Sequence, residues 1–128
     1  MEQLTRNRWF WCIPQNVWKG VEPDLHPYGA CYHDLAERRS TGVIEYLKVQ
    51  QVGAVIVGGL ALDYCVRTTA RQLRQAGFRV LLYLPACRAL TQAGAIEACG
   101  ALAADGVILC GDEAALDHQL SLIKEDRP

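Results

Sequence analysis

The sequence predicts an α/β fold of three layers, α/β/α, in which helices cover both faces of a parallel, Rossmann-like sheet. Two observations predict it. From residue 35 onward, segments of helical periodicity alternate with short apolar runs, several of them next to glycines. A short continuous apolar run is typical of a parallel strand buried on both faces. Alternation of helices and strands along a chain is the pattern of such a sheet.

The predicted elements follow in chain order. We expect a strand at Gln15 to Lys19 and a long irregular loop from Gly20 to Asp34, where prolines interrupt the pattern. At 128 residues the chain is long enough for one modest domain. The regular part predicts a helix near Leu35 to Gln51, a strand at Ala54 to Val57, a helix that contains Cys65, a strand at Arg79 to Leu84, a helix near Gln92 to Ala103, a strand at Gly106 to Cys110 and a helix near Asp112 to Lys124.

The most informative element is the helix that contains Cys65. The strand before it ends at Gly58-Gly59, Asp63 is a residue type that caps helix N-termini, and Gly77 stands where a glycine would end the helix. Cys65 therefore falls in the first turn, where unpaired N–H groups and the helix dipole favour thiolate over thiol. The same N–H groups are suited to an oxyanion hole. The alternative is an inert core cysteine.

Composition limits the classes of function. Hydrophobic residues make up 51% of the chain and charged residues 21%, which describes a globular protein. A net charge of -1 gives no indication of nucleic acid or an anionic membrane as partner. The apolar runs are too short to span a bilayer and no signal-peptide pattern is present, so we expect a cytoplasmic protein. Six cysteines and three histidines lack zinc-ligand spacing, which predicts reduced thiols and no self-contained metal site.

Two segments resemble signatures of one family. The segment from Lys19 to Pro23, followed by Tyr28-Gly29-Ala30, looks like the nicotinamidase pattern of a strand ending in Lys-Gly, then Pro, then Tyr-Ser-Ala-Phe. The segment from Gly59 to Val66 resembles the Gly-Leu-Ala-Thr-Asp-Tyr-Cys-Val box of the same enzymes, which belong to the isochorismatase-like (cysteine hydrolase) superfamily. The similarity covers roughly residues 15 to 120.

The resemblance implies a single, incomplete isochorismatase-like hydrolase domain over residues 1–128, similar to the C-terminal two-thirds of a nicotinamidase. It implies hydrolysis of a small-molecule amide, nicotinamide, to nicotinate and ammonia through a thioester on Cys65. It also implies that Lys19 is the lysine of an Asp-Lys-Cys triad and that the N–H groups of Ala61 and Cys65 form the oxyanion hole, with a cis peptide at Leu60-Ala61. The residues implied to line the substrate pocket are Tyr28, Leu60 and Tyr64.

Parts of the family pattern have no match in this sequence. These are the Asp-x-Gln-Asn-Asp-Phe box with the triad aspartate, and the Asp and His residues that bind a divalent metal, zinc or iron. The fold is therefore expected to lack its first strands, which in the family lie between the strand of Lys19 and the strand of Val55. An exposed apolar strand edge is a liability that soluble proteins cover. We expect a homo-oligomer or a complementing N-terminal chain to cover it.

Other functions stay open on the sequence alone. The chain could be a non-catalytic fragment, or a scaffold or interaction subunit of the same fold, because the aspartate base is unmatched. It could also be another cysteine hydrolase, such as a ureido- or carbamoyl-amidase. Nucleotide binding is less well supported, since Gly58 to Ala61 lacks the G-x-G-x-x-G spacing.

Overall fold

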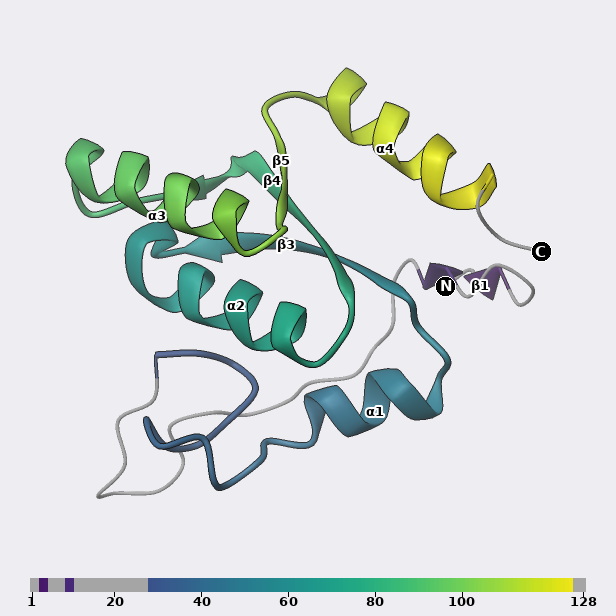
Figure 1. The fold of residues 1–128 in the computed structure, drawn as a ribbon, viewed down its shortest axis with the longest axis horizontal. Helices are drawn as coiled ribbons and strands as arrows, with labels where there is room; N and C mark the ends of the chain where they lie inside the picture. The colour runs from purple at the N-terminus through teal and green to yellow at the C-terminus, as the bar shows by residue number, and fades with distance from the viewer. Residues whose placement is uncertain (1–2, 5–8, 11–27, 126–128) are drawn as a thin grey trace.

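The structure is a computed structural model that describes residues 3–4, 9–10 and 28–125 (Figure 1). The predicted strand at Gln15 to Lys19 and most of the predicted loop lie outside the described residues. In chain order the elements are β1 (Gln3–Leu4), β2 (Trp9–Phe10), α1 (Val43–Val49), β3 (Ala54–Leu60), a single π-helical turn η1 (Leu62–Val66), α2 (Arg67–Gln75), β4 (Arg79–Arg88), α3 (Gln92–Ala104), β5 (Ile108–Cys110) and α4 (Glu113–Glu125).

The main sheet is parallel, as predicted, with strand order β3-β4-β5. Its register pairs Ala54 with Arg79 and Leu81 with Ile108. The central strand, β4, is longer than the predicted Arg79 to Leu84 and continues to Arg88, where it pairs with β3 again after a bulge. A separate antiparallel pair is formed by β1 and β2. The carboxyl ends of β3 and β4 therefore lie together at one edge of the sheet.

Alternate side chains of β4 enter two cores, one on each side of the sheet. Val80 and Leu82 pack in the larger core, with residues of α1, α2 and α3. Leu81 packs in the smaller core, against Ile123 of α4. In Figure 1, α2 and α4 lie on opposite sides of the strands. Full burial of such a side chain contributes about 1.5–3 kcal/mol. Helices thus cover both faces of the sheet, which confirms the three-layer prediction.

The strand β3 is less buried than its apolar run predicts. Val57 is buried, but Ile56 is 45% exposed. Among the described residues β3 pairs only with β4, so its other edge has no strand beside it there. The prediction of a strand buried on both faces was wrong for this part of the chain, because the face of β3 that carries Ile56 is partly open to solvent.

The helix predicted near Leu35 to Gln51 is wrong in its first half. The observed helix, α1, contains only Val43–Val49. Before it, the Asp34 carboxylate accepts the backbone N–H groups of Arg38 and Arg39, each at 3.0 Å. Glu37 has a positive φ of 59°. Side-chain bonding to the backbone competes with helix formation, and here it holds residues 34–39 in a turn.

The remaining helix ends agree with the sequence to within a few residues. Gly77, with φ of 101°, follows α2, and the Phe78 amide donates to the Leu73 carbonyl at 3.2 Å. Such a bond satisfies a carbonyl that the ended helix leaves unpaired. Thr91 caps α3 by accepting from the Gly94 amide at 2.9 Å. These ends fix the lengths of the two helices that contact the turn after β3.

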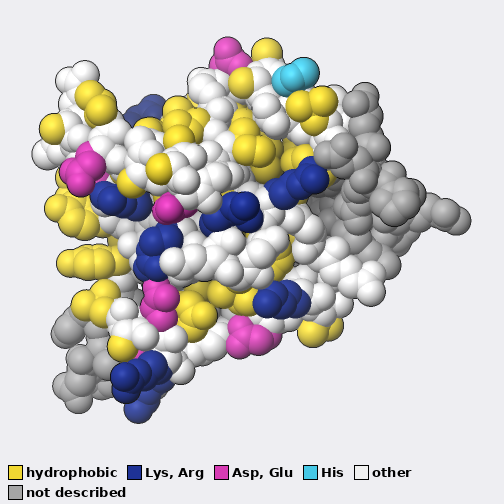
Figure 2. Space-filling view, viewed as in Figure 1, with side chains coloured by type: hydrophobic (Ala, Val, Ile, Leu, Met, Phe, Trp, Pro, Cys, Tyr) yellow, Lys and Arg dark blue, Asp and Glu magenta, His cyan; other side chains and the backbone are white. Residues whose placement is uncertain are grey.

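The face shown in Figure 2 carries basic and acidic side chains that lie among one another. Two arginines of α2 follow this pattern, because Arg67 lies 3.9 Å from Glu97 and Arg71 forms an ion pair with Glu37. No helix among the described residues has both the length and the apolar run that crossing a bilayer requires.

Candidate active site

Cys65 lies in the turn that joins β3 to α2, as the sequence predicts. This turn, η1, is wider than an α-helical turn because the Val66 amide donates to the Ala61 carbonyl five residues earlier, at 2.9 Å. The Tyr64 amide donates to the same carbonyl at 3.1 Å. The two donors are the residues before and after Cys65, and Cys65 itself is partly exposed. The thiol is thereby held at the carboxyl edge of the sheet.

The backbone before this turn has two unusual features. The peptide bond between Leu60 and Ala61 is cis, which confirms the expectation from the family resemblance. Gly59 has a φ of 134° and lies at the bulge where the pairing of β3 with β4 shifts register. Only glycine adopts such a φ without strain. The glycine therefore permits the change of direction that leads the chain from β3 into the Cys65 turn.

Asp63 does not cap the helix, which corrects the sequence prediction. No side chain caps η1 or α2. The Asp63 carboxylate instead accepts the Leu90 backbone N–H at 3.1 Å. The π-helical turn begins at Leu62, so Asp63 is already inside it, and its side chain points to the connection between β4 and α3. Asp63 thus joins the Cys65 turn to that connection.

A small cavity of about 200 Å³ opens beside the thiol. Its lining comes from β3, the Cys65 turn, α2 and the segment before α1, through Ala30, Val57, Gly58, Leu60, Cys65, Val66 and Thr69. Pockets for drug-sized ligands measure about 300–1,000 Å³, so this one suits a smaller molecule or is incomplete. Leu60, a predicted pocket residue, is 73% exposed at its rim. The lining is mostly apolar, with the thiol and a hydroxyl among it.

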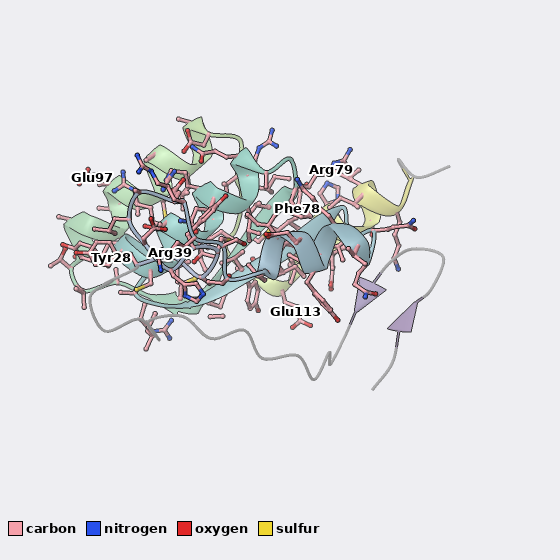
Figure 3. The ribbon with its side chains drawn as sticks, turned by 90° about the horizontal axis from the view of Figure 1, so that it is seen from below. Tyr28, Arg39, Phe78, Arg79, Glu97 and Glu113 are labelled. Atoms are coloured by element: carbon pink, nitrogen blue, oxygen red, sulfur yellow. The ribbon has the colours of Figure 1, made fainter. Side chains whose placement is uncertain are left out.

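The two predicted pocket tyrosines contact each other. The ring centroids of Tyr28 and Tyr64 lie 5.8 Å apart, with an angle of 47° between the ring planes. Both rings are about half exposed, at 49% and 47%. Figure 3 shows Tyr28 at the end of the molecule opposite Arg79, the first residue of β4. Tyr64 is next in sequence to Cys65, and Tyr28 is two residues before Ala30. The tyrosine pair therefore lies at the carboxyl edge of the sheet.

Three of the other described cysteines are held as neutral thiols. Burial, with Glu37 and Glu45 nearby, raises the pKa of Cys31 to about 12. Burial also raises the pKa of Cys87 and of Cys110 above the usual thiol value. The five described cysteines are all free of disulfides. Thiolate chemistry at neutral pH is thus disfavoured at these three buried positions.

Two parts of the predicted site are not described. Lys19 lies outside the described residues. Within residues 28–125, no three side chains of His, Cys, Asp or Glu lie close enough together to hold a metal ion. The described residues therefore do not fit a metal site.

Sequence reasoning missed the α2 side of the cavity. Thr69 lies four residues after Cys65, and residues at this spacing share a helix face. Its hydroxyl accepts the Ala30 backbone N–H at 2.9 Å, so it is both a lining residue and an anchor for the neighbouring segment. The spacing was visible in the sequence, but the partner, 39 residues away, was not.

Known proteins match this chain over much of its length. The family model described as "Isochorismatase domain" matches residues 3–114. A nicotinamidase of Acinetobacter baylyi is 31% identical over 79 residues, which cover 62% of this chain and 36% of that protein. A nicotinamidase of Escherichia coli is 34% identical over 70 residues, covering 55% of this chain and 32% of that protein. The chain thus spans about a third of the length of these relatives.

Solved structures that are similar to this chain also include nicotinamidases and pyrazinamidases. A nicotinamidase/pyrazinamidase of Acinetobacter baumannii superposes with a TM-score of 0.64 at 29% identity, covering 73% of this chain and 44% of that one. A pyrazinamidase of Pyrococcus horikoshii in complex with zinc gives 0.63 at 25%, with 71% and 47% covered. PnC1 from L. infantum in complex with nicotinate gives 0.62 at 31%, with 66% and 41% covered. Because the family model matches most of the residues of this chain, the chain belongs to the isochorismatase family.

Proposed function

We propose that this chain carries the nucleophile of a nicotinamidase-type amidohydrolase, which converts nicotinamide and water to nicotinate and ammonia in NAD salvage. The observation that carries the proposal is the position of Cys65, in a turn at the carboxyl end of β3 and beside a small cavity. The relatives named nicotinamidases support the choice of an amide substrate. A pyridine carboxamide is small and mostly flat, and so matches a cavity of this size.

The proposed reaction runs through a thioester. A base takes the Cys65 proton, the thiolate sulfur bonds to the carboxamide carbon, and the carbonyl electron pair moves onto oxygen. The N–H groups of Ala61 and Cys65 are the proposed donors to that oxyanion, and loss of one such donor typically costs about 10²–10³ in kcat. The carbon–nitrogen bond then breaks as the proton passes to nitrogen and ammonia leaves. Water adds to the thioester, the carbon–sulfur bond breaks, and nicotinate and the thiol result.

Neither the base nor the cation of this reaction is among the residues that the structure describes. Lys19, by resemblance, would favour the thiolate by its charge. The aspartate base and the ligands of a zinc or iron ion would come from residues not matched in this sequence. Free cysteines fit a reducing compartment, so we place the reaction in the cytoplasm.

A second chain is proposed to complete the sheet, either another copy or a complementing N-terminal segment. The support is the unpaired edge of β3 among the described residues, together with the exposed Ile56 side chain on the same strand. Long apolar edges of this kind pair with other strands. Should the completing chain bring no base, the fold would serve as a scaffold or interaction subunit instead.

The test is ammonia release from nicotinamide by the purified chain, with zinc or iron added. Cys65→Ala should abolish turnover, while Cys99→Ala, which alters another partly buried free thiol, should leave it unchanged. Release from a ureido substrate but not from nicotinamide would move the function to a ureido- or carbamoyl-amidase. A folded chain that releases no ammonia, alone or with a complementing N-terminal segment, would overturn the proposal and leave the scaffold function.

A further inference from the structure

The segment of residues 28–41 is fastened to α2 at several points. The Ala30 amide donates to the Thr69 hydroxyl at 2.9 Å, and the Cys31 amide donates to Gln72 Oε1 at 3.3 Å. The Thr41 hydroxyl donates to the Ala30 carbonyl at 2.7 Å, which closes the segment on itself. The segment is therefore held as a folded unit against the helix that follows Cys65.

Gln72 is the central anchor among these contacts. It is 4% exposed, and among the described residues it is the polar side chain that the core encloses. Its oxygen accepts the Cys31 amide, and its nitrogen donates to Glu37 Oε1 at 3.3 Å. Glu37 also accepts from Arg71, one residue before Gln72. A buried amide with a partner at each end is stable, whereas loss of a partner leaves an unsatisfied polar group.

The segment lies close against α2 at Gly29. A Cβ atom added at Gly29 would lie 2.4 Å from Gln72 Oε1 and 2.9 Å from the Thr68 methyl carbon. The backbone at Gly29 thus rests directly on the Gln72 side chain. The position of Gln72 sets the height of this part of the segment above α2.

The same segment forms one wall of the site. Ala30 lines the cavity beside Cys65, and the Tyr28 ring packs on the ring of Tyr64, the residue before Cys65 in the sequence. Both residues lie within three positions of Cys31, whose amide Gln72 holds. A shift of the anchor would therefore move the wall relative to the sulfur.

We propose that Gln72 is a positioning residue: by holding the Cys31 amide and the Glu37 carboxylate, it fixes Ala30 in the wall of the cavity and so limits the size of the molecule that reaches Cys65. This inference rests on the proposed role of Cys65 as nucleophile. The specificity it explains is one of size, for a small planar acyl group against larger ones.

The test compares alkylation of Cys65 by iodoacetamide and by the bulkier N-phenylmaleimide, with the modified peptide identified by mass spectrometry. Gln72→Leu keeps the side-chain size but removes both hydrogen bonds, and should raise the ratio of bulky to small reagent by about fivefold or more. Glu37→Ala breaks the far end of the anchor outside the core and should shift the ratio in the same direction. Gln92→Leu replaces an exposed glutamine at the start of α3, away from the Gln72 contacts, and is the matched control that should leave the ratio unchanged.

A purely structural role would lower the melting temperature of Gln72→Leu without changing the ratio, and that result would overturn the inference. If Gln72→Leu does not fold, Glu37→Ala decides alone, with an unchanged ratio counting against the inference. Alkylation needs no turnover, so the positioning role of Gln72 and the proposed amidase function can fail separately. A changed ratio in a chain that never releases ammonia would support the positioning role and contradict only the amidase function. In an active enzyme, Gln72→Leu should raise KM for nicotinamide more than it lowers kcat.

Discussion

The Asp63 carboxylate accepts the Leu90 backbone N–H at 3.1 Å and so connects the turn of Cys65 to the chain that leaves β4. This contact spans 27 residues of sequence. A hydrogen bond of this kind contributes about 0.5–1.5 kcal/mol. The bond thus links two loops at the carboxyl edge of the sheet, one of which holds the candidate nucleophile.

Asp63→Ala should lower the free energy of unfolding by about 1 kcal/mol, because the Leu90 amide loses its acceptor. Asp63→Asn keeps an oxygen in the same place and should retain most of that stability. Urea unfolding of both variants measures the difference. Equal destabilisation by Ala and Asn would show that charge, and not the hydrogen bond to Leu90, is the contribution of Asp63.

Cys65 should react with iodoacetamide before the three buried cysteines near neutral pH. Burial raises the pKa of Cys31, Cys87 and Cys110, so these remain thiols, while Cys65 opens on the cavity. Time-resolved peptide mapping after limited alkylation gives the order of labelling. Cys65→Ser serves as the control for assignment, and labelling of Cys99 as fast as Cys65 would contradict an activated nucleophile.

Gly29→Ala should destabilise the protein by about 1–3 kcal/mol, since the new methyl group would overlap Gln72. Gly100→Ala is the matched control, because a Cβ there meets nothing within 4 Å and the position is inside α3. Replacing a glycine in a helix by alanine should stabilise by about 0.5–1 kcal/mol. Thermal unfolding of both variants checks that the two changes in stability have opposite signs. A Gly29→Ala variant of unchanged stability would mean that the segment of residues 28–41 can move away from α2.

The turn at residues 34–39 should weaken in acid. Hydrogen bonds from the backbone, first that of Arg39 and then that of Arg38, hold the pKa of the Asp34 carboxyl below its ordinary value. Its contribution is therefore present above the unfolded pKa of about 3.9 and is lost as the pH falls through the folded value. Titration of the Arg38 and Arg39 amide shifts by NMR follows this loss. Asp34→Asn should remove the transition, and an unchanged transition would assign it to another group.

Ile56→Lys should weaken any association through β3. The side chain is 45% exposed on a strand with one unpaired edge among the described residues, and a charge there opposes strand addition. Analytical ultracentrifugation over a range of concentrations should show assembly in the parent chain and less in the variant. Ile96→Lys replaces a 68% exposed isoleucine on α3 and should have no effect. A parent chain that stays monomeric at every concentration would exclude the homo-oligomer.

Local signals in the sequence were sufficient for the Cys65 unit. An apolar run, two glycines and a helix that ends at Gly77 placed the thiol correctly, because strand, turn and helix each depend on neighbours in the chain. The cis peptide at Leu60-Ala61 was expected only from the family resemblance, and the structure contains it.

The errors arose where a distant partner or a side chain changed a local preference. Asp63 has the residue type of a helix cap, but a backbone amide 27 residues away takes its carboxylate. Residues 35–42 have no strong helix breaker before Gly42, yet Asp34 bonds to the backbone and holds them in a turn. The exposure of Ile56 depends on which strands lie beside β3, and no periodicity within that strand reports this.

The strand β4 has a neighbour on each side at Leu81 and Leu82, but at Cys87 and Arg88 its only partner within the described part of the chain is β3. Backbone amides of the first part should exchange with deuterium only when the whole domain unfolds, since both side chains are fully buried. Amides near Cys87 should exchange by local opening, at a lower free energy. The end of the sheet beside Cys65 can then adapt to a bound molecule while the opposite end remains closed.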